Sequence, residues 1–342
     1  MEYSPPPKSP SHHLRRGIRG IGRVGGRGAW MGVDQAVVSL GNFVTCAILA
    51  RHLPERQWGS YGLLLETILF LNGLQAAVVN YPLTVRAAGD GRQLRRSTTV
   101  AMLLSTAMLP VLAIAMFASS RGAGGMTVGA AAVVAMALWQ VQETLRRALV
   151  ADARIAASVP GDCLSYLGQA AAMWVLARMG LLTLPMALLA IGGTSALAAA
   201  VQVIQVGLER IGWADLLATA RDFWRLGRWM LLSNCTALVT SLGLLWTLRF
   251  SGGLDAVAMF TALAMLLKLG NPVFSGISAL LVPAVAKAHR VGMHEARREA
   301  LRWTGLGAMV LLPYYLGLCV LPGLALRLCY GAHSPYLAAG ML

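Results

Sequence analysis

Two ionisable residues lie inside long apolar stretches of the sequence, where a charge is costly. Lys268 occurs in ALAMLLKLGNPVFSG and Glu66 in LLLETILF. A charge at bilayer depth costs at least about 2.5–3.5 kcal/mol on insertion scales, so it normally has a function or a partner. Lys268 is therefore expected either to bind an anionic group in a cavity or to pair with a carboxylate for structure alone. Glu66 is expected to pair with Lys268, to bind a coupling proton or Na⁺, or only to reach the outer surface.

The residues that follow Lys268 predict a break in the helix that carries it. Pro272 has no N–H group, so the carbonyl of Lys268 loses its helical hydrogen bond. An apolar span interrupted by glycine and proline is typical of the binding sites of transporters. Gly270 and Pro272 are therefore predicted to form a hinge, and Asn271, which lies between them, to contribute to binding.

Amide and hydroxyl side chains recur on one face of several apolar stretches. At 100° per residue, an arc of about 120° on the first stretch holds Gln35, Ser39, Asn42 and Thr45. Such faces either line a cavity that suits a sugar or form interhelical hydrogen bonds, which are worth about 0.6 kcal/mol each. The predicted binding residues on these faces are Gln35, Asn42, Asn72 and Asn234.

The elements that would carry these residues are membrane-spanning helices. Hydrophobic residues make up 57% of the 342 residues and charged residues 13%, with a mean hydropathy of +0.62. A soluble domain carries about 25% charged residues, so this chain could not cover its surface in water. Because about 20 apolar residues span a bilayer, the sequence predicts an all-α polytopic transmembrane bundle of about nine spans. They are 30–50, 61–82, 98–118, 126–145, 160–178, 182–206, 229–248, 256–284 and 303–323.

The net charge of +15 is explained by topology rather than by nucleic-acid binding. With the N-terminus in the cytoplasm, 22 of the 29 Lys and Arg residues fall on the inner side of the predicted spans and six on the outer side. Cytoplasmic loops of membrane proteins carry this excess. The charge is spread between apolar spans and forms no single basic patch, so nucleic acid is not an expected partner.

Four segments are predicted along the chain. Residues 1–28 form a basic cytoplasmic tail without an apolar face and are expected to be disordered. Residues 29–207 hold six spans, and residues 208–228 read as an amphipathic helix on the inner leaflet. The dipeptide Trp30–Met31 recurs as Trp229–Met230, an offset of 199 that indicates a parallel repeat. Residues 229–342 would then be an incomplete second lobe of three spans with the start of a fourth, and the chain is expected to be truncated.

The stretch SLGNFVTCAILARHLPERQWGSYGLLLETILFLNGL resembles the opening of the polysaccharide-biosynthesis flippases of the Wzx type. These proteins belong to the multidrug/oligosaccharidyl-lipid/polysaccharide exporter superfamily. The residues that match the family pattern are Arg51, Trp58, Gly59 and Tyr61. The resemblance implies a two-lobed bundle with a central cavity. It also implies flipping of an undecaprenyl-pyrophosphate-linked oligosaccharide across the bacterial cytoplasmic membrane, with Lys268 meeting the pyrophosphate or a sugar acid.

Three alternatives remain at this stage. One is a cation-coupled drug exporter of the same superfamily, and another is an inactive truncated fragment. The third is an envelope polysaccharide polymerase or ligase, which is disfavoured because the predicted outer loops are short and no P-loop, H-E-x-x-H or G-x-S-x-G motif occurs. The chain is therefore expected not to be an enzyme and to need no cofactor beyond H⁺ or Na⁺. The expected partners are membrane lipids and polysaccharide-assembly proteins.

Overall fold

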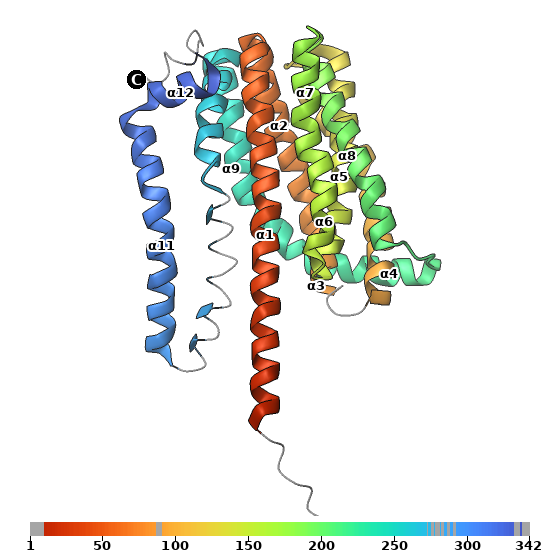
Figure 1. Ribbon diagram of the computed structural model, residues 1–342. Helices are drawn as coiled ribbons and strands as arrows, with labels where there is room; N and C mark the ends of the chain where they lie inside the picture. The colour runs from red at the N-terminus through yellow and green to blue at the C-terminus, as the bar shows by residue number, and fades with distance from the viewer. Residues whose placement is uncertain are drawn as a thin grey trace, which may run out of the picture.

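A computed structural model describes residues 10–86, 91–271, 273–274, 277, 281, 284–285, 288–289, 292–331 and 336, with side chains from Trp30 onward. Within these residues the chain forms helices and turns and no strands, which confirms the predicted all-α class. Figure 1 shows the helices side by side in one bundle, with α11 on one flank of α1 and α5 to α8 on the other.

Most of the nine predicted spans correspond to single helices. They are α1 (Pro10–His52), α4 (Gly91–Ser120), α5 (Gly125–Ala151), α8 (Leu184–Val206) and α11 (Met293–Val320). Two spans are composite: α2 (Glu55–Gln75) continues through the π-helical turn η1 (Ala76–Asn80) into α3 (Tyr81–Arg86), and α6 (Ile155–Asp162) continues through η2 (Cys163–Leu167) into α7 (Gly168–Arg178).

The seventh and eighth predicted spans are joined in one long helix, α9 (Trp213–Lys268). Its backbone departs from helical geometry at Gly253, with φ 76° and ψ −169°. A glycine adopts this positive φ without the steric cost that a side chain would add. A short helix, α12 (Pro322–Tyr330), follows α11. Seven helices in the described part are long and apolar enough to cross a membrane. Together with the composite fifth span and the division of α9, they account for about nine spans.

The helix α1 is longer than the sequence indicated. It begins at Pro10, so residues 10–28, expected to be disordered, are helical, while residues 1–9 lie outside the described residues. Nucleation is the costly step of helix formation, and adding a residue to an existing helix fixes one residue for one hydrogen bond. The apolar helix from Trp30 onward supplies that nucleus, which explains how a segment without an apolar face of its own is helical.

The π-helical turn η1 lies just before Pro82. Because proline has no N–H group, the carbonyl of Val78 lacks its usual partner four residues ahead. A wider turn absorbs this defect, and the helix then continues to Arg86 as the last part of the same span. The change of pitch brings Asn80 close enough for its Nδ2 atom to donate a hydrogen bond to Gln75 Oε1 at 3.2 Å.

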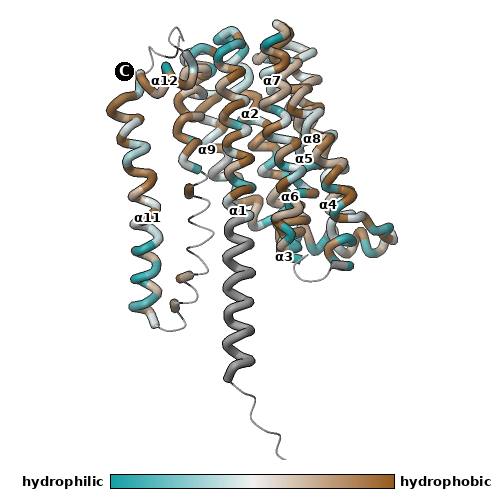
Figure 2. Tube along the Cα trace, viewed as in Figure 1, coloured by the Kyte–Doolittle hydropathy of each residue, from teal (hydrophilic) through white to brown (hydrophobic). Residues whose placement is uncertain are grey.

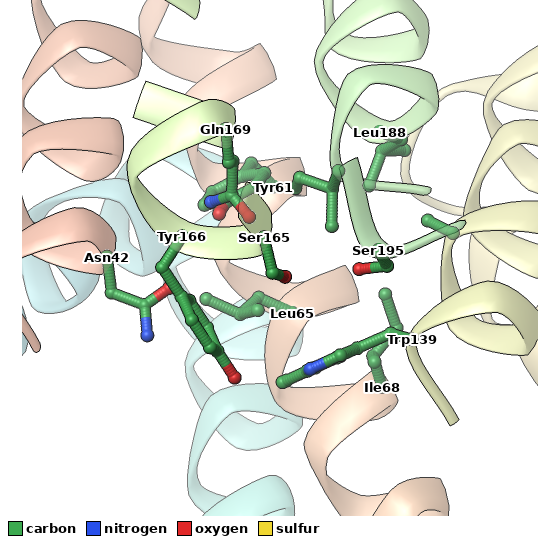
Figure 3. A pocket seen from close by; sticks show the side chains of 12 residues that line it. Asn42, Tyr61, Leu65, Ile68, Trp139, Ser165, Tyr166, Gln169, Leu188 and Ser195 are labelled. Carbon is green, nitrogen blue, oxygen red and sulfur yellow. The ribbon is translucent and has the colours of Figure 1, made fainter. Parts of the chain in front are cut away.

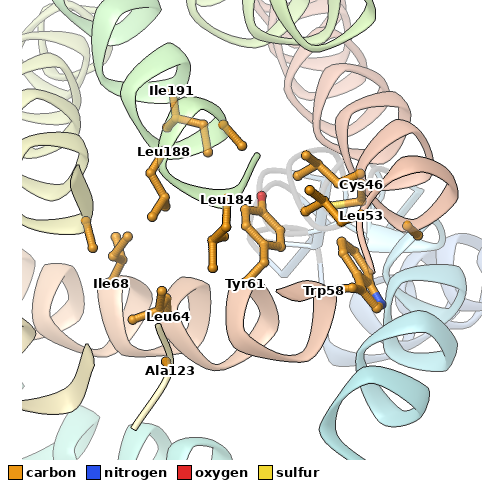
Figure 4. Close-up of a cluster of buried hydrophobic side chains, with 14 of the residues drawn as sticks. Cys46, Leu53, Trp58, Tyr61, Leu64, Ile68, Ala123, Leu184, Leu188 and Ile191 are labelled. Carbon is orange, nitrogen blue, oxygen red and sulfur yellow. The ribbon is translucent and has the colours of Figure 1, made fainter. Parts of the chain in front are cut away.

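A hydrophobic cluster joins the first two helices to α5, α8 and the second part of α9. It includes Cys46, Trp58 and Tyr61, with Leu188 of α8 and Ala258 of α9. Figure 4 shows Cys46, Leu53, Trp58 and Tyr61 in a group beside Leu184. Apolar side chains also cover the outside of the helices, with Val111, Ile114 and Ile204 among the most exposed. In Figure 2 the upper part of the bundle is mostly brown, and teal residues gather at the lower end of α11.

The first turns of α9 lie across the lower end of the bundle, beside α3 (Figure 1). Trp213 and Trp224 are exposed there, as expected for residues that face lipid. Phe223, which precedes Trp224, is instead buried in one hydrophobic cluster with Val79 and Leu83. The backbone of Gly227 approaches the Ala77 carbonyl closely, so this helix is packed against the bundle along the Phe223 side.

Candidate functional site

A cavity of about 400 Å³ lies among α1, α2, α5, η2 and the end of α9. Ligand pockets in proteins usually measure about 300–1,000 Å³, so the space is large enough for a ligand group. The lining combines amide, hydroxyl and charged side chains with aromatic and aliphatic ones. Its polar and aromatic lining consists of Gln35, Ser39, Asn42, Phe43, Asn72, Trp139, Glu143, Arg146, Arg147, Tyr166, Lys268 and Asn271.

Five of the seven residues predicted to bind substrate line this cavity: Gln35, Asn42, Asn72, Lys268 and Asn271. The sixth, Glu66, lies directly behind Lys268. The lysine Nζ atom donates a hydrogen bond to Glu66 Oε1 at 2.6 Å, so the pairing that the sequence left open as one alternative is present.

Asn234 is the predicted binding residue that stands apart. Within the part of the chain that the structure describes, this half-buried residue of α9 is not among those that line the cavity. The helical period that grouped it with Asn42 and Asn72 fixes only a direction around its own helix. Where that face lies relative to another helix depends on how α9 packs.

The predicted hinge coincides with a change in backbone hydrogen bonding. The helix α9 ends at Lys268, and the next two N–H groups bond three residues back rather than four, Leu269 to Leu266 at 3.2 Å and Gly270 to Leu267 at 3.3 Å. A Cβ atom at Gly270 would overlap the Tyr315 hydroxyl group of α11, so α11 approaches the chain closely at this point. Pro272 lies outside the described residues.

Asn72 presents an unsatisfied polar atom beside the cavity. Its side chain is 9% exposed, and its Oδ1 atom has no hydrogen-bond partner among the described residues. An unpaired buried polar atom costs about 1–3 kcal/mol, and this atom is covered by protein atoms rather than open to the cavity. On α1, Gln35 Nε2 contacts Ser39 Oγ at 3.4 Å.

A buried charge cluster adjoins the cavity and was missed by the sequence reasoning. Arg146 of α5 contacts Asp34 Oδ2 at 2.5 Å, Asp162 Oδ2 at 2.8 Å and Glu143 Oε2 at 3.6 Å. The four side chains are 13% exposed or less. Arg147 contacts the other oxygen of Glu143 at 2.6 Å but is about half exposed.

The hydrogen bonds around this cluster fix both aspartates. Ser158 donates to Asp34 Oδ1 at 3.3 Å, and Gln142 donates to Asp162 Oδ1 at 3.4 Å. Asp162 is fully buried, and Arg146 is its charged partner. Replacing one member of such a group leaves an uncompensated buried charge.

A signal for this cluster was present in the sequence. Asp34 and Asp162 are single carboxylates within the first and fifth predicted spans, and such residues are functional candidates on that ground alone. Arg146 was instead counted among loop residues, because the apolar run that precedes it ends at 145. In the structure α5 continues to Ala151, so the arginine is still on the helix.

The charges are arranged in two layers. Arg146, Arg147 and Lys268 line the cavity together with one carboxylate, Glu143. The carboxylates of Asp34, Asp162 and Glu66 contact these cations from behind without being part of the cavity lining. The surface that a ligand would meet is therefore mainly cationic, whereas the whole group holds four carboxylates for three cations.

A smaller void of about 30 Å³ adjoins the cavity and shares Asn42, Trp139 and Tyr166 with it. Figure 3 shows these three side chains together with Ser165, Gln169 and Ser195 around the void. A water molecule needs roughly 10–15 Å³ measured in this way, so the void has room for about two waters. The lining of the void carries no charged side chain.

The residues of the family pattern connect helices and, apart from Tyr61, do not line either space. Trp58 Nε1 donates to the Ala258 carbonyl at 3.2 Å, and its ring stacks on Tyr61 with 5.4 Å between ring centroids. A Cβ atom at Gly59 would overlap the Leu254 carbonyl. The pattern thus allows α2 to pack closely on the second part of α9.

Arg51, the fourth residue of the family pattern, joins the end of α1 to α12. Its guanidinium donates to the carbonyl oxygens of Cys329 at 2.8 Å and Leu328 at 2.7 Å. These are among the last carbonyls of a helix, which have no partner within it. The contact is exposed and lies away from the cavity. Among the described residues, no three His, Cys, Asp or Glu side chains are grouped so that they could hold a metal ion.

Comparison with known proteins relates this arrangement of helices to one group of transporters. No family model matches the sequence, and no curated protein matches it. A solved structure of a multidrug resistance MATE family transporter of the MOP superfamily, in an inward-facing conformation, has a TM-score of 0.72 and 13% identity. This match covers 91% of the present chain and 78% of the transporter.

Two further solved structures agree with this match. A MATE protein in complex with MaD3S has a TM-score of 0.61 and 14% identity over 94% of this chain and 78% of that one. A MATE protein in the bent conformation has a TM-score of 0.56 and 14% identity over 93% and 76%. At such identities the likeness concerns the fold: the chain has the helical fold of the MATE transporters of the MOP superfamily.

Proposed function

We propose that this protein is a transporter that moves a lipid-linked oligosaccharide bearing a pyrophosphate across the bacterial cytoplasmic membrane. The proposal rests on the mainly positive charge of the side chains that line the cavity. Three cationic side chains and one carboxylate line the cavity, with the other carboxylates behind them. A pyrophosphate that entered would meet Lys268 and Arg147 first, and charge-assisted hydrogen bonds to phosphate are among the strongest that side chains make.

The uncharged part of the lining supports the sugar portion of this substrate. Asn42, Asn72 and Asn271 line the same space, and a side-chain amide both donates and accepts hydrogen bonds. Sugar hydroxyl groups need partners of both kinds.

Transport against a gradient would require coupling, and the buried cluster around Arg146 supports a site for it. Three carboxylates surround Arg146, while Arg147 is the other cation in contact with them. One negative charge is therefore left over when all three are ionised. A proton would neutralise it. We propose this cluster, rather than Glu66 alone, as the site where a coupling H⁺ acts, because Glu66 is already paired with Lys268.

A cation-coupled exporter of drugs is the second candidate. The solved structure with a TM-score of 0.72 is described as a multidrug resistance transporter, and the excess of carboxylates in the charged groups would attract an organic cation. Against it stands the position of those carboxylates, since only Glu143 is part of the cavity lining. A cationic drug would have to displace Arg146 or Lys268 to reach the others.

The experiment that separates the two uses a deletion strain. The lipid-linked oligosaccharides are extracted, and the membrane face that holds them is determined with an impermeant sugar oxidant. Flipping predicts that they accumulate on the inner face and that the intact gene reverses this, whereas a gene encoding Lys268→Ala does not. Normal distribution with greater sensitivity to cationic drugs would favour the exporter. No change in either property would contradict both.

A further inference from the structure

The part of the cavity formed by Trp139, Tyr166 and Asn42 differs in character from the charged part. Trp139 and Tyr166 line both the 400 Å³ cavity and the adjoining 30 Å³ void. All the charged lining residues belong to the larger space, whereas the polar residues of the smaller void are amides and hydroxyl groups. The two aromatic residues and Asn42 therefore stand between a charged compartment and an uncharged polar one.

The side chains there match the chemistry of an uncharged pyranose ring. Aromatic rings present broad apolar faces that pack against the C–H face of a sugar, and the polar tips of Trp and Tyr can still form hydrogen bonds. In Figure 3 the rings of Tyr166 and Trp139 converge on the lower side of the void, with Asn42 beside Tyr166. Tyr166 is 5% exposed, so its ring is held by packing and offers only a small part of its surface, whereas the half-buried Trp139 supplies the larger contact.

The small void has a role of its own in this arrangement. It admits about two waters, which is too little space for a ring but enough for molecules that bridge sugar hydroxyl groups to the protein. Ser165, Gln169 and Ser195 supply donors and acceptors around it. Bridging waters are nearly as favourable as direct hydrogen bonds.

Two amides extend this surface into the larger space. Asn42 and Asn72 line it together with Trp139, and a side-chain amide both donates and accepts hydrogen bonds. Sugar hydroxyl groups need partners of both kinds, whereas an ionised pyrophosphate offers only acceptors.

We infer that Trp139 and Tyr166 form a subsite for an uncharged, hydroxyl-bearing pyranose, the sugar attached directly to the pyrophosphate of the carried lipid. The inference rests on the proposed function, since it assigns Lys268 and Arg147 to the pyrophosphate of the same molecule. It implies that the protein recognises the first sugar as well as the phosphate. A prenyl pyrophosphate without a sugar would then be a poorer ligand.

The test measures binding by the purified full chain in lipid nanodiscs, using isothermal titration calorimetry. The two probes are farnesyl pyrophosphate and the same lipid carrying one N-acetylglucosamine on the pyrophosphate. The sugar-bearing probe should bind about tenfold more tightly, the effect of a ring contact and one or two hydrogen bonds. Trp139→Ala should reduce its affinity to that of the sugarless probe, and Trp139→Phe should retain most of the difference.

The controls distinguish failure of the sugar subsite from failure of the proposed function. Trp174→Ala removes an exposed tryptophan that does not line the cavity and should change neither affinity. Thermal unfolding of Trp139→Ala near the native temperature shows that the variant is folded. Equal binding of both probes by the native chain, or a difference that survives Trp139→Ala, would overturn the sugar subsite and leave the proposed function standing. Failure of the native chain to bind either probe would overturn both.

Discussion

Lys268 and Glu66, 202 positions apart in the sequence, are joined by a hydrogen bond of 2.6 Å between Nζ and Oε1. The pair connects the end of α9 to the middle of α2, and Lys268 is the member that lines the cavity. Its side chain is 41% exposed and that of Glu66 is 21% exposed. A lysine held in this position by a carboxylate can contribute to stability, to ligand binding, or to both.

Removing the Lys268 ammonium group should lower transport strongly and affect folding little. Lys268→Ala is expected to lower transport of the lipid-linked oligosaccharide at least about tenfold, because the loss of one charge-assisted hydrogen bond costs roughly 1.5–3 kcal/mol. Transport is measured in proteoliposomes. The matched control is Arg56→Ala, which removes another ion pair between α2 and α9, one whose side chains are 82% and 53% exposed.

The double variant Lys268→Met with Glu66→Gln separates the two roles of the pair. Both charges are then absent, so no buried charge is left without a partner. If the pair serves structure alone, this variant should transport normally and unfold at the native temperature. We expect it to unfold near the native temperature and still fail to transport.

The pairing of these two residues could be anticipated from the sequence, and the cluster around Arg146 could not be assembled from it. The free-energy cost of placing a charge in the membrane marks each ionisable residue of a span as a candidate by itself. It marks Lys268, Glu66, Asp34 and Asp162 separately. Which of them meet depends on the packing of α1, α5 and α6, and on the π-helical turn that follows Asp162. Helix periodicity likewise grouped Gln35, Asn42 and Asn72, which line the cavity, but could not exclude Asn234 from it.

The close approach of α2 to α9 depends on the absence of a side chain at Gly59. A Cβ atom there would overlap the backbone of Leu254, which cannot rotate away as a side chain would. Gly59→Ala should therefore lower the free energy of unfolding by about 1–3 kcal/mol. The measurement is thermal unfolding of the purified protein in detergent.

Gly193→Ala is the matched control for this substitution. Gly193 is also in a membrane-spanning helix, α8, but among the described residues nothing lies within 4 Å of where its Cβ would be. It should leave stability unchanged or raise it slightly, since alanine is about 1 kcal/mol better than glycine within a helix. Equal destabilisation by both substitutions would show that the contact with Leu254 is not the cause.

The contact of Arg51 with the end of α12 should control how firmly that helix is held. Arg51→Gln removes the guanidinium that donates to the carbonyls of Leu328 and Cys329. We expect Cys329, which is partly buried, to react faster with a maleimide. Cys319 of α11 is already exposed and is the internal control. Mass spectrometry resolves the two sites, and equal acceleration at both would indicate general unfolding instead.

Two arginines that make similar contacts should contribute differently to the free energy of unfolding, because one is buried and the other is exposed. Arg146 binds Asp34 and Asp162 and is 13% exposed, whereas Arg86 makes two hydrogen bonds to Asp222, of 2.6 and 2.7 Å, and is 45% exposed. Arg146→Met should lower the free energy of unfolding by about 3–5 kcal/mol, because it leaves buried carboxylates without their cation. Arg86→Met should cost less than about 1 kcal/mol, as exposed ion pairs do.

A second substitution in the buried cluster tests whether uncompensated charge causes this loss of stability. If uncompensated charge is the reason for the loss, Asp162→Asn in the Arg146→Met background should restore part of the stability, while Asp162→Asn alone should lower it. A coupling energy between the two substitutions measures this directly. Independent, additive losses would mean that Arg146 acts through packing rather than charge, and the proposal that this cluster binds a coupling proton would lose its basis. Coupled losses would retain it, because a site that titrates during transport must hold carboxylates whose charge depends on their partner.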